Sequence, residues 1–426
     1  MASASIWQIF TKDNAPLNGM RAGNVTIDNH NRVWICKLQN DSLIAFEKGK
    51  WFEYSASDLR GDSSNLIGAF LDKKGLQYFN FSTATANPYA RSYSIIKYQD
   101  GLFQPAAVPA NCSDFLRADQ IIADTANNLL CNVILPSSMF SETELGIFRV
   151  SASMCSSIVD FQKADSLIKI ADSSIDVQAS TLAAAIAVDS SNGLWMTMLP
   201  GSDIYRENYG LFHIFGDSIT IFNKWNSPLP SNNINCIYVD SSDIIWVGTW
   251  GGVAKLHDTT WTIYTTANSG LPDNDVHCFK RASDGSMWIA ASSIGYIPGG
   301  VVTSNGGVAR LKNGQWEAFT RSNSSLPASE IQQIAEDSSG NIWMAAGTSL
   351  AVYNPNGVNF VSSPLQSRSE HAIGAPVSRV VFGFSSRVDP ALSGARYFDI
   401  RGRDMGLNGL AGQSKGVCIM RRDGAR

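Results

Sequence analysis

Short apolar runs alternate with polar turns along most of this chain, most clearly between residues 234 and 265. Valine, isoleucine, tryptophan and threonine there suit the pleated, half-buried surface of a strand. The four runs cover residues 234–239, 244–249, 253–257 and 261–265. Between the first two, Asp240–Asp243 carries aspartate and serine, whose side chains close turns by binding the backbone two residues on. The pattern predicts an antiparallel meander of four short strands.

The same unit returns about every fifty residues, marked by an aspartate six positions before a tryptophan, as in Asp240 and Trp246. A period of this length is typical of a repeat fold. In the sixth copy Ala282 replaces the aspartate. The anchor positions are Trp34, Tyr78, Leu130, Trp195, Trp246, Trp288 and Trp343.

Seven four-stranded units predict an all-β fold, a seven-bladed β-propeller, because stacked sheets arranged radially bury their faces and leave only short edges. A solenoid would need a shorter period, and no stretch shows sustained helical periodicity. We expect the anchor tryptophans to pack between blades and the aspartates to cap turns.

The start of the chain resembles the end of a unit. Residues 6–11 followed by Ala15-Pro16-Leu17 match Trp261–Tyr264 followed by Gly270-Leu271-Pro272. We therefore expect the N-terminal strand to complete the last blade and close the ring. Residues 358–361 are the alternative strand for that place.

The clearest units resemble the two-component-regulator type of propeller repeat, through Trp246–Thr249 followed by Gly252–Lys255. The resemblance implies either the extracytoplasmic sensing half of a hybrid histidine kinase or part of a secreted surface protein. The expected location is therefore extracellular or on the cell surface, or periplasmic for a sensor fragment.

The C-terminus carries a second resemblance. Arg396–Arg403 and Lys415–Arg421 resemble the last strands of a sorting domain for type IX secretion, although Cys418 stands where tyrosine is usual. This implies the secretion machinery as a partner and a division into a propeller over 1–363, a linker over 364–390 and a partial sorting-domain-like segment over 391–426. The interpretation predicts that residues after about 365 can be removed without unfolding the propeller.

Composition narrows the function. Lysine and arginine number 33 against 37 aspartates and glutamates, a net charge of −4, with no basic run that could neutralise successive phosphates. We expect no nucleic-acid partner, no membrane span, no metal or other cofactor, and a monomer. The first residues lack the pattern of a leader peptide. The odd number of cysteines, 7, leaves at least one unpaired.

The connection between strands two and three is the only one that expands repeatedly. It is long at 81–91, 136–145, 200–209 and 292–305, and all these loops emerge on one side of a propeller. Loops on a rigid scaffold are where binding residues concentrate. Exposed aromatic rings beside polar groups suit a sugar ring or a protein partner. The candidate ligand-binding residues are Trp250, Tyr205, Arg206, Tyr209, Tyr89, Arg91 and Tyr296.

These observations favour a ligand-recognition module for carbohydrate or a protein partner over a purely structural surface protein. Two alternatives stay open. The first is a detached sensor module of a two-component system, and the second is a propeller lyase or glycoside hydrolase. An enzyme would need a pair of carboxylates in the site, one with a raised pKa, and no catalytic residue can be assigned.

Overall fold

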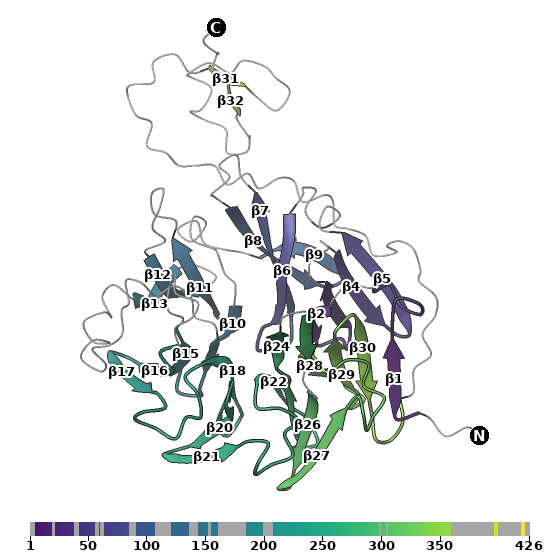
Figure 1. Cartoon of the computed structure of the whole chain (residues 1–426). Helices are drawn as coiled ribbons and strands as arrows, with labels where there is room; N and C mark the ends of the chain where they lie inside the picture. Colours follow the sequence, from purple (N-terminus) through teal and green to yellow (C-terminus); the bar gives the residue numbers. More distant parts are fainter. Residues whose placement is uncertain are drawn as a thin grey trace. The chain divides into compact units, whose positions relative to one another are not determined.

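The computed structural model describes residues 5–18, 22–37, 42–55, 59, 64–84, 91–106, 121–135, 144–151, 155–160, 185–198, 208–297, 300–303, 306–358, 396–398 and 419–421. The chain divides into two compact units, Met1–Pro376 and Val377–Arg426. The first unit is an all-β, seven-bladed propeller of four-stranded antiparallel sheets, as predicted (Figure 1).

The first four blades follow one another along the chain. Blade 1 holds β2 (Ala22–Ile27), β3 (Val33–Lys37), β4 (Ser42–Glu47) and β5 (Lys50–Ser55). Blade 2 holds β6 (Ser64–Leu71), β7 (Gln77–Ala84), β8 (Arg91–Gln99) and β9 (Leu102–Pro105). Blade 3 holds β10 (Ile121–Ala123), β11 (Leu129–Leu135), β12 (Glu144–Val150) and β13 (Cys155–Asp160). Blade 4 holds β14 (Ile186–Val188), β15 (Leu194–Thr197), β16 (Leu211–Phe215) and β17 (Ser218–Phe222).

The last three blades carry the clearest repeats. Blade 5 holds β18 (Ile234–Val239), β19 (Ile245–Thr249), β20 (Gly252–His257) and β21 (Thr260–Tyr264), within a residue of the predicted strands. Blade 6 holds β22 (Val276–Arg281), β23 (Met287–Ala291), β26 (Gly307–Lys312) and β27 (Gln315–Thr320). Blade 7 holds β28 (Ile331–Glu336), β29 (Ile342–Ala346) and β30 (Ser349–Tyr353).

The N-terminal strand closes the ring. β1 (Trp7–Phe10) pairs antiparallel with β30, in the register Trp7 with Tyr353 and Phe10 with Leu350, and becomes the fourth strand of blade 7. Val358, which begins the competing segment, donates its backbone N–H to the Ser5 carbonyl instead. The prediction that the first strand completes the last blade is therefore confirmed.

The six-residue spacing has a direct structural cause. In blades 1, 4 and 7 the Oδ2 of the turn aspartate accepts the indole N–H of the anchor tryptophan, at 2.9, 3.0 and 2.9 Å. In six blades Oδ1 accepts backbone N–H groups two and four residues later. The six aspartates are Asp28, Asp72, Asp124, Asp189, Asp240 and Asp337.

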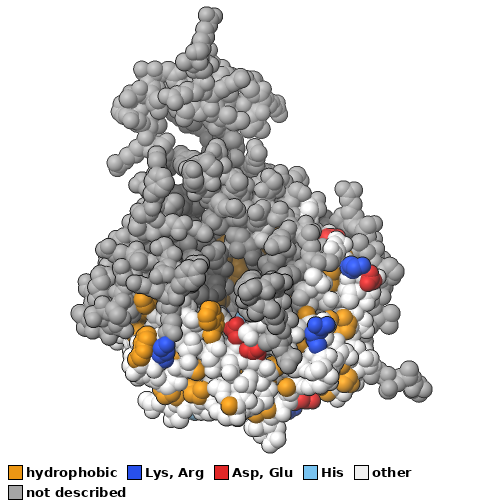
Figure 2. Space-filling model, viewed as in Figure 1, with side chains coloured by type: hydrophobic (Ala, Val, Ile, Leu, Met, Phe, Trp, Pro, Cys, Tyr) orange, Lys and Arg blue, Asp and Glu red, His pale blue; other side chains and the backbone are white. Residues whose placement is uncertain are grey.

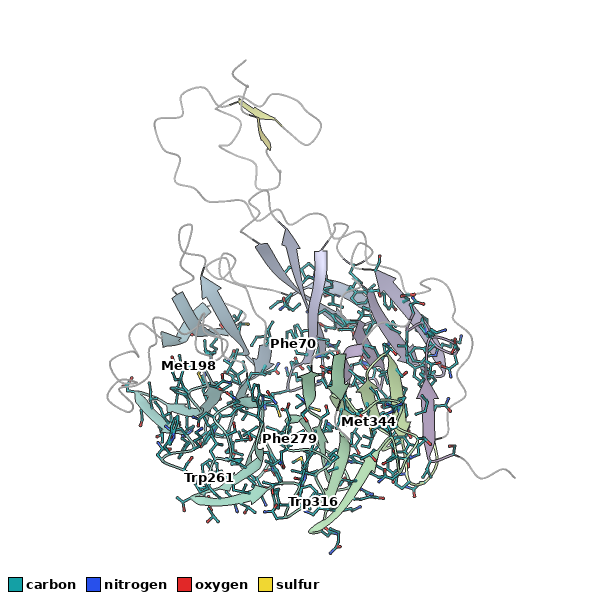
Figure 3. All side chains as sticks on the ribbon, in the orientation of Figure 1. Phe70, Met198, Trp261, Phe279, Trp316 and Met344 are labelled. Carbon is teal, nitrogen blue, oxygen red and sulfur yellow. The ribbon has the colours of Figure 1, made fainter. Side chains whose placement is uncertain are left out.

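The anchor tryptophans are core residues, as expected, and none is more than 6% exposed. The hydrophobic clusters lie between neighbouring blades. Phe279 of blade 6, labelled in Figure 3, has its ring centroid 6.2 Å from that of Trp246 in blade 5. Met344 of blade 7 belongs to one cluster with Trp288 of blade 6.

The turns between first and second strands also join blades. Their last residue adopts the left-handed conformation, which asparagine and aspartate tolerate; φ is 63° at Asn31, 64° at Asn127, 65° at Asn192 and 57° at Asp243. Each of these side chains accepts a backbone N–H from the turn of the preceding blade, from Ser338, Lys73, Thr125 and Ser190 respectively. We call this side of the propeller the turn face, and the opposite side the loop face.

Three predicted loops differ in the structure. In blade 2 the strands β7 and β8 extend into the expected loop, so Phe81 and Arg91 lie in strands. Leu145 likewise lies in β12 of blade 3. In blade 6 the expected loop contains a hairpin of β24 (Ile294–Ile297) and β25 (Gly300–Thr303). In each of these cases strand pairing satisfies backbone N–H and C=O groups of the long connection.

In the second unit, β31 (Arg396–Phe398) pairs antiparallel with β32 (Ile419–Arg421). These two short strands form a small β-appendage at the segments that resemble a sorting domain. The proposed linker over 364–390 lies outside the described residues. The sorting function and the domain boundaries stay predictions.

Candidate functional site

Trp250 stands at the tip of the two-residue loop between β19 and β20, on the loop face. Its side chain is 60% exposed, among the most exposed of the large hydrophobic side chains that the structure describes. Its backbone N–H is bound to the Asn233 carbonyl at 3.0 Å. A side chain on the next residue would not fit, because a Cβ at Gly251 would lie 2.7 Å from the Pro230 carbonyl oxygen. The loop is therefore rigid, although the indole is open to solvent.

Asn235 connects this indole to the next blade. Its Oδ1 accepts the Trp250 indole N–H at 3.1 Å, and its Nδ2 donates to Asp275 Oδ1 at 2.7 Å. Asn235 is the extra residue at a register shift between Ile234 and Cys236. Such a β-bulge redirects a side chain and is common beside functional sites. The bulge thus directs Asn235 to the indole N–H of Trp250, and the two faces of the indole ring stay available to a ligand.

Asp275 and His277 continue the cluster on blade 6. His277 occupies the same bulge position as Asn235, and its Nε2 lies 2.6 Å from the Ser292 carbonyl oxygen and 3.8 Å from Asp275 Oδ2. Asp273 Oδ1 accepts the Asp275 backbone N–H at 2.9 Å. The side chains of Asp275 and His277 are 21% and 32% exposed. We call Trp250, Asn235, Asp273, Asp275 and His277 the mouth cluster.

Burial raises the pKa of the Asp275 carboxyl above its ordinary value of 3.8; His277 and the Asn235 hydrogen bond lower it, and Asp273 raises it. A carboxyl that stays half-desolvated beside a histidine can accept a hydrogen bond from a ligand hydroxyl or N–H. Acidic side chains lie next to hydrophobic ones near the middle of the ring (Figure 2). The mouth cluster therefore combines an aromatic surface with charged hydrogen-bonding groups.

The raised Asp275 pKa gives a stability prediction with a defined sign. Because the folded-state pKa lies above the unfolded value, protonated Asp275 contributes stability that is present below pH 3.8 and lost as the pH rises through the folded pKa. The difference in melting temperature between Asp275→Asn and the native chain should therefore shift in favour of the variant as the pH rises from 3.5 to 7. Thermal unfolding at both pH values measures the difference. The exposed Asp258→Asn is the control, and an equal gain there would contradict the assignment.

The structure leaves most other predicted site residues without a described side chain. Tyr205, Arg206 and Tyr89 lie outside the described residues, and only the backbones of Arg91 and Tyr296 are described, in β8 and β24. Tyr209 is half-buried and packs against the hydrophobic cluster of Leu130, Ile147 and Met196. Its place favours packing, and a binding role for it stays a prediction.

Trp225 is a second exposed tryptophan on the loop face that sequence reasoning missed. It lies in the connection from β17 to β18, is 71% exposed, and has Lys224 Nζ 5.1 Å from its ring centroid. An alignment of the repeats could have identified Trp225, because Ala267 and Ser322 occupy the same position before the connecting asparagine in the next two repeats. Because these two repeats fold with a small residue at this position, the fold does not require a large aromatic there.

Among the described residues, no group of three or more histidine, cysteine, aspartate or glutamate side chains could hold a metal ion. Burial raises the pKa of the Cys36, Cys131 and Cys278 thiols to about 12, so these thiols stay protonated and are poor nucleophiles. In the part of the chain that is described, no helix is long and apolar enough to cross a membrane.

Three segments of the chain, residues 228–251, 270–293 and 325–348, match the two-component regulator propeller family. They correspond to the repeats of blades 5, 6 and 7. The resemblance inferred from Trp246–Thr249 is thus confirmed for these repeats. No curated protein sequence matches the chain.

Solved structures share the fold at low identity. The extracellular domain of BT3049 from B. thetaiotaomicron, assigned to a hybrid two-component system, is 17% identical with a TM-score of 0.56; the match covers 82% of this chain and 41% of that one. Virginiamycin B lyase from Staphylococcus aureus is 14% identical with a TM-score of 0.51, over 81% and 98% of the two chains. YCF48 bound to D1 peptide is 11% identical with a TM-score of 0.51, over 84% and 98%. An extracellular domain of a two-component system, a lyase and a protein bound to a peptide share this architecture, so the fold alone does not decide the function.

Proposed function

We propose that this protein is an extracytoplasmic recognition propeller that binds a carbohydrate or a protein partner on its loop face. The observation that carries the proposal is Trp250, a rigidly held and exposed indole whose polar edge is already bound to Asn235. An indole presented in this way loses little conformational entropy when a ligand packs on it. Asp275 and His277 supply hydrogen bonds beside it, which would orient the ligand.

The location is part of the proposal. Its support is that the chain resembles extracellular domains from B. thetaiotaomicron, since the BT4673 domain also matches at 13% identity, a TM-score of 0.51 and 88% of this chain. The chain spans 41% of the BT3049 domain and 47% of the BT4673 domain. Signalling by a larger protein is therefore a second candidate function, favoured by the three family segments. A chimera carrying residues 1–363 as the sensing part of a histidine kinase tests it, because ligand should then change autophosphorylation.

Trp250→Ala should weaken binding by about 30-fold or more, the loss typical of a central aromatic anchor. Its melting temperature should stay unchanged, because the exposed indole buries little area. A glycan and peptide array identifies the ligand, and titration calorimetry then measures the two affinities. Trp225→Ala should give a smaller loss of binding affinity if the ligand extends outward along the loop face.

Phe215→Ala is the matched control, because Phe215 is 53% exposed at the end of β16, next to the turn that joins β16 to β17 on the turn face. Unchanged binding in Trp250→Ala, or an equal loss in Phe215→Ala, would rule out the proposed site. The lyase or glycoside hydrolase alternative is decided with the same ligand. Product formation that disappears in Asp275→Asn would indicate catalysis instead of recognition.

A further inference from the structure

Blade 6 contains a cavity where the other blades carry a carboxylate. Ala282 stands at the position of the turn aspartate, and a cavity of about 110 Å³ opens beside it on the turn face. Its lining includes Trp288, Arg310, Asp284 and Glu336. In the other six blades the aspartate side chain lies at this place and accepts N–H groups of its turn. Blade 7 has a cavity of about 370 Å³ at the same place although Asp337 is present. What distinguishes the cavity of blade 6 is therefore that its turn supplies no carboxylate at position 282.

The strand register shows which hydrogen-bond donor lacks an acceptor in blade 6. Arg310 pairs across from Trp288, as Arg149 pairs across from Leu130 in blade 3. Arg149 Nε lies 2.8 Å from Asp124 Oδ2, an ion pair without the alignment of a hydrogen bond. Arg310 Nε is buried and has no acceptor among the described residues. In both blades this Nε makes no hydrogen bond to a described residue. A carboxylate lies beside it in blade 3, whereas in blade 6 the terminal nitrogens of Arg310 face Asp284 and Glu317 and no described carboxylate is paired with Nε.

The anchor tryptophan of blade 6 adds a second donor. Trp288 is 2% exposed and lines the cavity, and within the described residues no acceptor binds its indole N–H. Trp246 lacks an indole acceptor too, although Asp240 is present, so the indole alone does not define the site. The site is defined by the cavity, the indole and the unpartnered Arg310 Nε together.

The acidic groups at the cavity already have donors. Asp284 Oδ2 is bound by Arg310 Nη2 at 2.7 Å and by Lys312 Nζ at 2.8 Å, and these groups hold its pKa well below its usual range. Glu336 is bound by the backbone and hydroxyl of Ser283 at 2.7 and 2.6 Å. Arg310 Nη1 also lies 3.6 Å from Glu317 Oε2, so Arg310 and Lys312 already face three carboxylates. The Trp288 indole N–H and Arg310 Nε are the donors left for one further acceptor.

We propose that this cavity, which we call the blade 6 socket, binds a single carboxylate group from outside the chain. The ligand carboxylate would take the place that Asp124 or Asp337 fills in its own blade, between the anchor indole and the Arg310 Nε. The volume suits an acetate-sized group, given about 30 Å³ for each water molecule displaced. Because carboxylates already surround Arg310 and Lys312, the attraction for a further anion is weak, and affinity is on the order of millimolar.

The test uses the full chain labelled with 5-fluorotryptophan and followed by fluorine NMR during titration with sodium acetate. The Trp288 resonance, assigned from its absence in Trp288→Phe, should move saturably, whereas sodium chloride at equal ionic strength should not move it in this way. The Trp343 resonance is the internal control, because Asp337 already binds its indole. Equal, unsaturated responses to acetate and chloride would overturn the proposal.

Ala282→Asp supplies the missing carboxylate from the chain. Its Trp288 resonance should stand near the acetate-bound position and stop responding to acetate. If this variant does not fold, Arg310→Gln takes its place and should abolish the saturable shift. A persistent acetate response in the folded variant would contradict the site.

A second titration distinguishes two sources of the carboxylate. A tripeptide of glycine, glutamate and glycine with blocked ends is compared with its glutamine counterpart. A shift with the glutamate peptide alone assigns the socket to an acidic side chain of a partner, and a shift with acetate only assigns it to a free small acid. No shift with any of the three overturns the proposal.

Discussion

Phe10→Ala is expected to lower the free energy of unfolding by about 3–5 kcal/mol, the usual cost of removing a buried phenylalanine ring. Phe10 is fully buried at the seam between blades 7 and 1. Its ring centroid lies 5.0 Å from that of Trp51 and 5.8 Å from that of Phe46, both in blade 1, and 5.9 Å from that of Trp343 in blade 7. The substitution therefore leaves a cavity at the point where the ring closes. Denaturant unfolding followed by tryptophan fluorescence measures the loss.

Ile6→Ala is the control for this prediction, because Ile6 directly precedes the same strand but is 47% exposed. It should change stability by less than about 1 kcal/mol. Deletion of residues 1–12 removes the Phe10 side chain together with the whole of β1. It should therefore lower the melting temperature more than Phe10→Ala does. A deletion that melts like the native chain would show that β1 does not hold the ring closed.

Asp337→Ala is expected to cost about 3–5 kcal/mol, because it leaves buried donors without an acceptor. Asp337 is 8% exposed. Its Oδ1 accepts the backbone N–H groups of Ser339 and Asn341 at 2.9 and 3.0 Å. Its Oδ2 accepts the side-chain amide of Asn341 at 2.8 Å and the indole of Trp343 at 2.9 Å. Chemical denaturation of the variant measures the cost.

Asp240→Ala is the matched comparison, since Asp240 occupies the same repeat position but, among the described residues, its side chain binds only the backbone N–H groups of Ser242 and Ile244. The Trp246 indole is not among its partners. Its loss should therefore be about 1–2 kcal/mol, the cost of a turn or cap bond. Equal losses in the two variants would show that the bond to the indole contributes little and that the spacing reflects turn closure alone.

The proposed binding face could be predicted in part from the sequence. Trp250 could be identified as exposed because its two-residue connection is too short to bury an indole, and the structure confirms that exposure. Asn235, Asp275 and His277 could not be found in this way. Each lies at or next to the start of a first strand, where a bulge in the pairing decides its direction. A register shift depends on the partner strand, so the local sequence does not reveal it.

The sequence by itself determined the repeat, the number of blades, the turn aspartates, the core tryptophans and the strand that closes the ring. Each of these follows from local spacing, because a turn, a strand and its buried side chain repeat with the same period. Only the tertiary structure decided which side chains contact one another between blades. It joined Trp250 to Asp275 through Asn235, and it placed Arg310 and Ala282 in the lining of one cavity. These contacts join residues from different strands or blades, and their geometry depends on strand register and on the packing of complete sheets.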